Sequence, residues 1–186
     1  MTPEDRQLDP EFLLTHRPLV LYRLARARYA NLSGIGASFA PGRWNRPGQE
    51  AIYTSTEAGV PVLERLAHTS KELIPSNLAL MKIRVAGNWE AQKNAILDPG
   101  TGGCLWFYRQ LADAKRAFKA GPQLFAAGMN PFAMAVPSVL VPVWNVVLYP
   151  QGTGFWDHVS LESVEPFEFD PRLFPESAIQ EAEEQG

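Results

Sequence analysis

The sequence is poor in the residues that build disulfides and metal sites. It contains one cysteine, Cys104, and three histidines that lie far apart in the chain, His16, His68 and His158. A single cysteine excludes an intramolecular disulfide and a zinc site made of several cysteines. The scattered histidines make a metal site a poor expectation, so we look for a chemistry that needs no metal.

The sequence also lacks long apolar runs, a secretory leader and an excess of positive charge. No run approaches the roughly 20 apolar residues needed to cross a bilayer, and the opening MTPEDRQLD does not resemble a leader. The 17 basic and 20 acidic residues give a net charge of −3, which argues against a dedicated nucleic-acid-binding protein. We expect a cytoplasmic protein that binds neither a membrane nor, directly, nucleic acid.

Apolar residues and turn formers, by contrast, are abundant. The chain of 186 residues is 46% hydrophobic and contains 16 prolines and 14 glycines. This composition supports a sizeable core and favours short strands joined by turns over a bundle of long helices. It predicts one compact α+β domain, a mostly antiparallel sheet with packed helices. We place the domain at residues 18–175, after a polar lead-in at 1–17 and before an acidic tail at 176–186.

Hydrophobic patterning predicts the individual elements. Strands are expected at 19–24, 51–54, 78–86, 132–142 and 143–149, with one or two more in 158–170. A long loop should cover 30–49, where glycine and proline prevent any single regular element. Helices are expected over 105–121 and from about 57–60 to Lys71, because Pro61 fits only the first turn of a helix.

Two charged residues lie among apolar neighbours, and each has a structural and a functional interpretation. Glu64 lies at the edge of an apolar helical stripe, where it forms a salt bridge, is simply a surface glutamate, or serves a reaction. The structural partners would be Arg65, His68 or a distant arginine. Arg23, inside an apolar strand, either extends to solvent or pairs structurally, or binds an anion such as a phosphate.

Four further residues are weak signals when taken one at a time. Arg43 beside Trp44 fits a cation–π or packing pair, Tyr53 fits an ordinary strand aromatic, and Ser138 fits a turn. Asn145 is unusual because it lies in the middle of a valine-rich strand, where its amide must find partners and would tie down a loop.

The order and spacing of these residues resemble the RES domain family, named for arginine, glutamate and serine. The early part of the resemblance is GRWN, a glycine, the strand AIY and a glutamate in the following helix, so that Arg43, Tyr53 and Glu64 stand ten and eleven residues apart. The later part comprises VPS, the asparagine strand and PFEFDPRL. Two departures occur, since Pro41 replaces the first glycine of GGRWN and YPQG (149–152) replaces the family's NP.H.

The resemblance implies a fold similar to ADP-ribosyltransferase toxins and NAD as the substrate. Carried over by position, Arg23, Arg43, Tyr53, Glu64 and Ser138 would line the NAD site, with Asn145 beside them. Family members degrade NAD by hydrolysis or phosphorolysis, or transfer ADP-ribose to a protein. Many are toxins paired with an antitoxin that carries a DNA-binding domain and occludes the site. Homo-oligomers are also compatible with the sequence.

These residue types suit cleavage of the bond between nicotinamide and ribose. The ribose gains positive charge as the bond breaks, and a fixed carboxylate such as Glu64 stabilises that charge. Arginines grip a pyrophosphate through paired hydrogen bonds, and a tyrosine ring stacks on nicotinamide. The acceptor stays open among water, phosphate and a protein side chain. A non-catalytic module that binds a partner's tail is the alternative of a different class.

Overall fold

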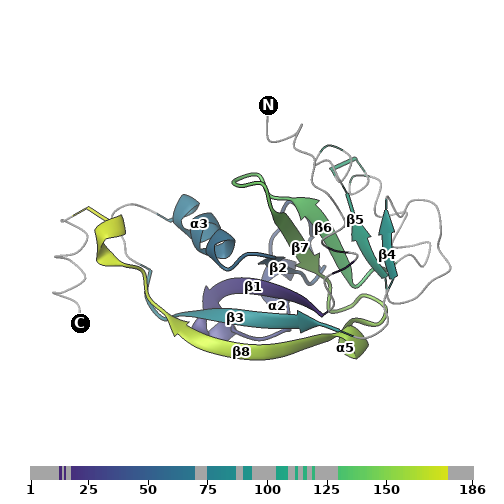
Figure 1. The fold of residues 1–186 in the computed structure, drawn as a ribbon, viewed down its shortest axis with the longest axis horizontal. Helices are drawn as coiled ribbons and strands as arrows, with labels where there is room; N and C mark the ends of the chain where they lie inside the picture. Colours follow the sequence, from purple (N-terminus) through teal and green to yellow (C-terminus); the bar gives the residue numbers. More distant parts are fainter. Residues whose placement is uncertain are drawn as a thin grey trace.

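The fold is an α+β arrangement in which one sheet runs through the whole described part of the chain (Figure 1). The computed structural model describes residues 13, 15, 18–69, 75–86, 90–93, 104–108, 112, 115, 116, 119 and 130–175. The strands are β1 (Leu19–Arg26), β2 (Ile52–Ser55), β3 (Leu78–Val85), β4 (Glu90–Lys93), β5 (Cys104–Phe107), β6 (Ala133–Pro137), β7 (Trp144–Leu148) and β8 (Val159–Phe167). The helical segments are η2 (Ala27–Tyr29), α2 (Ile35–Ser38), α3 (Gly59–Ala67), α5 (Phe155–His158) and η4 (Pro171–Leu173).

The sheet has eight strands in the order β4-β5-β6-β7-β2-β1-β3-β8. Its pairs are antiparallel from β6 through to β8, whereas β4–β5 and β5–β6 are parallel. Helix α3 packs on β1 and β2 near the middle of the sheet (Figure 1). The predicted fold class, a mostly antiparallel sheet with packed helices, is confirmed.

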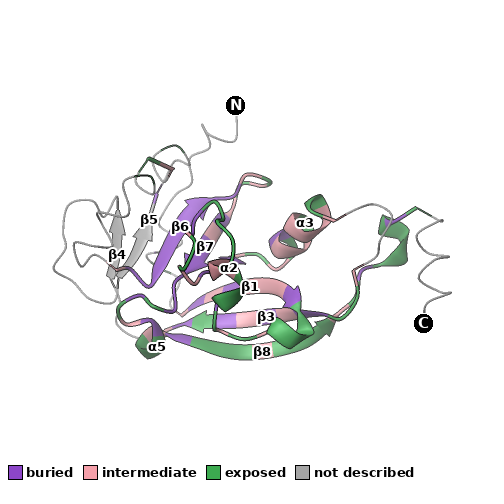
Figure 2. Cartoon of the chain, turned by 180° about the vertical axis from the view of Figure 1, so that it is seen from behind, coloured by how far each residue is buried: buried purple, intermediate pink, exposed green. Residues whose placement is uncertain are grey.

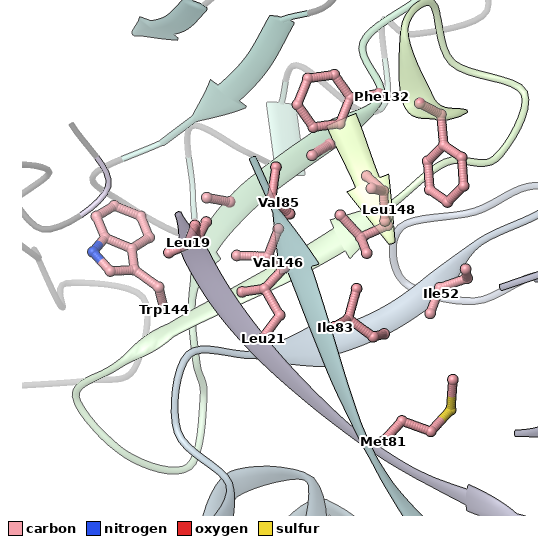
Figure 3. Packing of buried hydrophobic residues seen from close by; sticks show 14 of the residues in the cluster. Leu19, Leu21, Ile52, Met81, Ile83, Val85, Phe132, Trp144, Val146 and Leu148 are labelled. Carbon is pink, nitrogen blue, oxygen red and sulfur yellow. The ribbon is translucent and has the colours of Figure 1, made fainter. Parts of the chain in front are cut away.

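Alternating side chains explain why β3 pairs where it does. Met81, Ile83 and Val85 are fully buried, while Lys82 is half-buried and Arg84 is exposed, as the sequence pattern predicts. Its buried face joins apolar residues from β1, β2, β6 and β7 in one core cluster (Figure 3). A slip of one residue would turn that face to solvent, so burial fixes the register.

Strands β6 and β7 are apolar on both faces, and β6 is buried along its whole length (Figure 2). Val146 and Leu148 face the main core, whereas Val147 faces a second cluster that includes Trp44 and Tyr149. The loop between β1 and β2 covers this second face. Asn145 is the half-buried polar exception in β7.

Helix α3 begins at Gly59, which places Pro61 in its first turn as predicted. Val62 and Leu66, one helical turn apart, pack against a third cluster around Leu78, Phe169 and Phe174. The helix ends at Ala67 with His68 as its cap, earlier than the expected end near Lys71, and residues 70–74 lie outside the described residues.

The prediction of a helix over 105–121 was wrong at its start, because residues 105–107 belong to the strand β5. The run Leu105–Trp106–Phe107 is short, apolar and aromatic, and such runs suit a buried strand as well as a helix. Parallel pairing with β4 and β6 decides the outcome. The described residues further along, 112, 115, 116 and 119, are helical.

Several other expectations meet the structure with small differences. The loop predicted over 30–49 contains the short helix α2, and β4 was not predicted. Of the lead-in at 1–17, only residues 13 and 15 are described, and the tail at 176–186 lies outside the described residues. In the part of the chain that is described, no helix is long and apolar enough to cross a bilayer.

Candidate functional site

The candidate site is organised around one row of paired residues that crosses four strands. Tyr22 of β1 pairs with Ser55 of β2, Ser55 pairs with Asn145 of β7, and Asn145 pairs with Val136 of β6. Residues paired in register point to the same face of a sheet, so these side chains share the face on which α3 lies. Tyr22 and Ser55 are the registered pair between β1 and β2, whereas β2 and β7 have four registered pairs.

Glu64 and Asn145, which are 81 residues apart in sequence, meet on this face. The Asn145 Nδ2 donates a hydrogen bond of 3.2 Å to the Glu64 Oε1. Both side chains are half-buried. The Asn145 amide thus has the partner that a mid-strand asparagine requires, although that partner is a helical carboxylate and not a loop. In the described structure it is Asn145, rather than Arg65 or His68, that hydrogen-bonds Glu64.

Tyr53 lies two residues before Ser55 on the same face, and the loop between β1 and β2 holds its hydroxyl. The Tyr53 Oη donates to the Asn45 Oδ1 at 2.7 Å and accepts the Trp44 N–H at 3.1 Å. The side chain as a whole is 39% exposed. Because the hydroxyl is engaged as donor and acceptor, the ring is the part of Tyr53 that is available to a ligand.

Arg43 is exposed, in contrast to the buried residues Trp44 and Asn45 that follow it. Burial raises the pKa of the Tyr53 hydroxyl, and the Trp44 N–H and the positive charge of Arg43 oppose that rise. The electrostatic effect places the Arg43 charge near the Tyr53 phenol. The loop residue Arg43 and the Tyr53 ring of β2 therefore form a cation and an aromatic ring side by side, as a site for an anionic ligand with an aromatic group requires.

Arg23 follows Tyr22 in β1 and, by strand alternation, points to the opposite face from Asn145 and Ser55. Its Nη1 donates to the Asn31 carbonyl at 3.1 Å. Burial lowers the pKa of the Arg23 guanidinium from its usual value. A bound anion would offset this cost of burying a charge. The structure thus places Arg23 beside Tyr22, the β1 residue that pairs with β2, and on the opposite face from Glu64 and Tyr53.

Ser138 lies just beyond β6, two residues after Val136, and is completely buried. Its N–H donates to the Val143 carbonyl at 2.8 Å, and its Oγ accepts the Leu140 N–H at 3.2 Å. These bonds shape the turn between β6 and β7, which is the structural interpretation given above. The register puts Ser138 close to Asn145, on the same face of the sheet.

Three residues at this site had no assigned role in the sequence interpretation, namely Gly42, Asn45 and Tyr149. Asn45 is 2% exposed and donates from Nδ2 to the carbonyls of Ala37 and Ala40. The buried Tyr149 donates to the Trp44 carbonyl at 2.8 Å. The motif GRWN contains Gly42 and Asn45, and this motif is the signal that could have found them.

The described residues hold no group of three or more histidine, cysteine, aspartate or glutamate side chains that would suit a metal ion. The groups that the site does present are a half-buried carboxylate, an exposed guanidinium and an aromatic ring. Such a set favours charge stabilisation of a bound cationic centre and grip of an anion.

Comparison with known proteins identifies the family of the chain. The model of the RES domain matches residues 20–170, which is most of the chain. The chain belongs to the RES domain family. This assignment confirms the resemblance carried by GRWN, the AIY strand and the later VPS and asparagine-strand motifs.

The RES chain has relatives of similar length. It is 30% identical over 158 residues to "Toxin Res" of Photorhabdus laumondii, covering 83% of this chain and 97% of that protein. It is 27% identical over 147 residues to "Prs ADP-ribosylating toxin" of a Sphingobium species, covering 77% of this chain and 86% of that protein. Its fold is similar to the M. tuberculosis MbcT–MbcA toxin–antitoxin complex, with a TM-score of 0.51, 19% identity and coverage of 87% and 90%.

The second departure from the RES pattern, YPQG, forms an ordered turn after β7. The Gly152 N–H donates to the Tyr149 carbonyl at 2.8 Å. A Cβ at Gly152 would lie 2.3 Å from the Pro131 carbonyl oxygen, so the close approach requires glycine here. The departure therefore replaces the family's asparagine with Tyr149, whose hydroxyl reaches the Trp44 carbonyl.

Proposed function

We propose that this RES protein cleaves the bond between nicotinamide and ribose in NAD. The observation that carries the proposal is the hydrogen bond between Asn145 and Glu64, which fixes a carboxylate on the face that also carries Tyr53. A carboxylate held by an amide is preorganised to stabilise positive charge. The RES family membership and the relative named as an ADP-ribosylating toxin support NAD as the substrate.

In this proposal the carbon–nitrogen bond breaks with its electron pair going to the nicotinamide nitrogen. Nicotinamide leaves as a neutral molecule, so no strong general acid is needed. The ribose carbon becomes cationic, and Glu64 stabilises it as the carboxylate does in glycoside cleavage. A nucleophile then forms the new bond to that carbon and gives up its proton.

The other residues bind and orient the substrate. Arg43 grips the pyrophosphate through its paired N–H groups. Arg23 points to the opposite face of the sheet from Asn145 and Ser55, so we assign the pyrophosphate to Arg43 alone. The Tyr53 ring stacks on nicotinamide. Asn145, at the start of β7, hydrogen-bonds the carboxylate. In this proposal Asn145 and Ser138, which lies just beyond β6, hold the amide or ribose end.

We also propose that the protein is the toxin of a toxin–antitoxin pair. The names of two relatives include "toxin", and the structural neighbour was solved as a toxin–antitoxin complex. The partner would be an antitoxin, with a DNA-binding domain of its own, that occludes the NAD site. The chain's charge of −3 agrees with leaving DNA binding to the partner.

A second candidate is transfer of ADP-ribose to a protein side chain. The Sphingobium relative's name, "Prs ADP-ribosylating toxin", specifically favours it. The first steps are the same, and only the nucleophile differs. Hydrolysis uses water, phosphorolysis uses phosphate and transfer uses a protein side chain.

One experiment tests cleavage and separates the acceptors. Purified protein is incubated with NAD carrying a label on its adenylate part, in buffer, in buffer with phosphate, and in lysate, while free nicotinamide is measured. Nicotinamide release with a labelled protein band supports transfer, and release with labelled small molecules supports degradation. Absence of nicotinamide release under all three conditions would overturn the proposal and favour a non-catalytic binding module.

A further inference from the structure

The main chain of Trp44, the residue after Arg43, is clamped by two tyrosine hydroxyls from different strands. The Tyr53 hydroxyl accepts the Trp44 N–H at 3.1 Å, and the Tyr149 hydroxyl donates to the Trp44 carbonyl at 2.8 Å. The first tyrosine is on β2 and the second follows β7, which are neighbouring strands. The two tyrosines thus hold both the N–H and the carbonyl of Trp44, and so fix the backbone next to Arg43.

Asn45, in the loop between β1 and β2, binds the same Tyr53 hydroxyl, and we call Asn45, Tyr53 and Tyr149 around Trp44 the clamp. Its Oδ1 accepts the Tyr53 hydroxyl at 2.7 Å, and its Nδ2 donates to the Ala37 and Ala40 carbonyls at 2.7 and 3.0 Å. At 2% exposure, this amide has its hydrogen bonds satisfied inside the loop. A buried polar group with several partners specifies one arrangement of the atoms around it, because any other leaves donors or acceptors unpaired.

Gly42 shows how tightly the clamp is packed. A Cβ at this position would lie 2.4 Å from the Tyr53 Oη and 2.3 Å from the Asn45 Oδ1, which are the two atoms of the hydrogen bond between them. The Gly42 N–H also donates to the Asn45 carbonyl at 3.1 Å. Glycine is therefore required for closeness to the clamp, and any side chain here would separate Tyr53 from Asn45.

We infer that Asn45 and Tyr149, with Gly42, are positioning residues that fix the Arg43 guanidinium relative to the Tyr53 ring. This inference rests on the proposed cleavage of NAD, in which Arg43 holds the pyrophosphate and Tyr53 holds nicotinamide. The clamp couples these two contacts, because the same hydroxyl that anchors the Tyr53 ring also anchors the residue next to Arg43. Tyr149 stands where the RES pattern has an asparagine, so this half of the clamp distinguishes the chain from that pattern.

The inference also narrows the role of Tyr53. Its hydroxyl proton goes to Asn45 and its oxygen accepts from Trp44, so the hydroxyl serves the protein and the ring serves the ligand. Tyr53 is therefore a stacking residue and not a proton donor to the substrate.

The first test uses two glycine substitutions in the same loop. Gly42→Ala deletes no functional group but inserts a methyl between the Tyr53 and Asn45 atoms, whereas a Cβ at Gly36 meets nothing within 4 Å. We expect Gly42→Ala to lower kcat/KM for nicotinamide release by about 10-fold to 100-fold, since displacement by about 1 Å has such effects. Gly36→Ala should stay within about twofold of the unmodified protein. Equal activity of the two variants would overturn the inference.

The second test asks whether Tyr149 acts through Arg43. Tyr149→Phe removes the hydroxyl, and its effect on the KM for NAD is compared in the Arg43 and Arg43→Ala backgrounds. If the clamp positions Arg43, the increase in KM caused by Tyr149→Phe should largely disappear once Arg43 is gone. A general structural defect would give the same fold-change in both backgrounds and would refute the positioning role. Tyr29→Phe, which removes a hydroxyl from the exposed η2, is the matched control.

A readout that does not need activity separates failure of this inference from failure of the proposed function. The stabilities of Tyr53→Phe, Asn45→Ser and the double variant are measured by urea unfolding. The clamp predicts that the second substitution costs less once the first is present, because the hydrogen bond between the two side chains is then already lost. The Asn45 bonds to the Ala37 and Ala40 carbonyls are lost in both backgrounds and do not contribute to this difference. Additive effects would contradict the clamp even if the protein cleaves NAD, whereas strong coupling without NAD cleavage would contradict only the proposed function.

Discussion

Replacing Asn145 with valine should lower activity while leaving the sheet intact. The substitution removes the 3.2 Å hydrogen bond to Glu64 but keeps the backbone pairs to Ser55 and Val136. A hydrogen bond to a charged group contributes about 1.5–3 kcal/mol, and 1.36 kcal/mol corresponds to a tenfold change in rate. Because Glu64 is half-buried and water replaces part of the lost bond, we expect kcat to fall by about 10-fold to 50-fold.

Stability provides the second half of this prediction. Valine suits a strand better than asparagine, on a scale that spans about 1 kcal/mol, so the free energy of unfolding should stay level or rise. The assay is nicotinamide release at saturating NAD together with urea unfolding of the same samples. Asn130→Ala is the control, because the Asn130 amide binds the exposed Gln151 carbonyl outside the site.

Two results would refute this reasoning. If Asn145→Val keeps the unmodified kcat, the hydrogen bond does not position the carboxylate. If it loses activity only in proportion to a large loss of folded protein, Asn145 serves the fold and not the reaction.

Other predictions concern the cation, the buried tyrosines and the core. Arg43→Lys should raise the KM for NAD by about tenfold, because a lysine cannot replace the planar guanidinium of arginine. Arg28→Lys on η2 should leave the KM unchanged, and equal effects of the two substitutions would argue against a contact between Arg43 and the pyrophosphate. Complete burial, together with the nearby Tyr53 and Tyr108, raises the pKa of Tyr149 well above its usual value. The contribution of Tyr149 to the free energy of unfolding is therefore full below about pH 10 and is lost as the pH rises through the pKa of Tyr149 in the folded protein. Urea unfolding at pH 8 to 11 should therefore show a fall above pH 10 of up to about 1.4 kcal/mol per pH unit per tyrosine, and an equally steep fall in Tyr149→Phe would contradict this. Ile83→Ala should cost about 2–5 kcal/mol of unfolding free energy, because Ile83 is fully buried in the main core, and a loss below 1 kcal/mol would contradict the packing.

The pattern of apolar and polar residues over a few positions predicted the elements that bury one face and expose the other. The alternation in β3 and the position of Pro61 in α3 follow from physical rules that act within a few residues. The strand at 105–107 was assigned to a helix because its apolar run fits both states, and its parallel partners β4 and β6 are remote in sequence. Long-range pairing of this kind leaves no periodic signal in a short segment.

In the candidate site, too, some residues were predicted from the sequence and others were not. Glu64 and Asn145 were each conspicuous as polar residues among apolar neighbours, and the structure joins them. The clamp formed by Asn45, Tyr53 and Tyr149 was not predicted, because hydrogen bonds between a loop and two strands have no fixed spacing. Gly42 likewise reads as an ordinary loop glycine until the neighbouring Tyr53 hydroxyl is placed.

The central claim is that the charge of Glu64 stabilises the ribose as nicotinamide leaves. Glu64→Gln tests it most directly, because the glutamine carbonyl can still accept the Asn145 amide and only the negative charge is lost. The decisive measurement is kcat for nicotinamide release, with the NAD dissociation constant measured on the same protein by calorimetry. We predict a fall in kcat of about 10²-fold to 10³-fold, with the dissociation constant changed by no more than about threefold. Unchanged kcat, or a loss explained wholly by weaker NAD binding, would contradict the account.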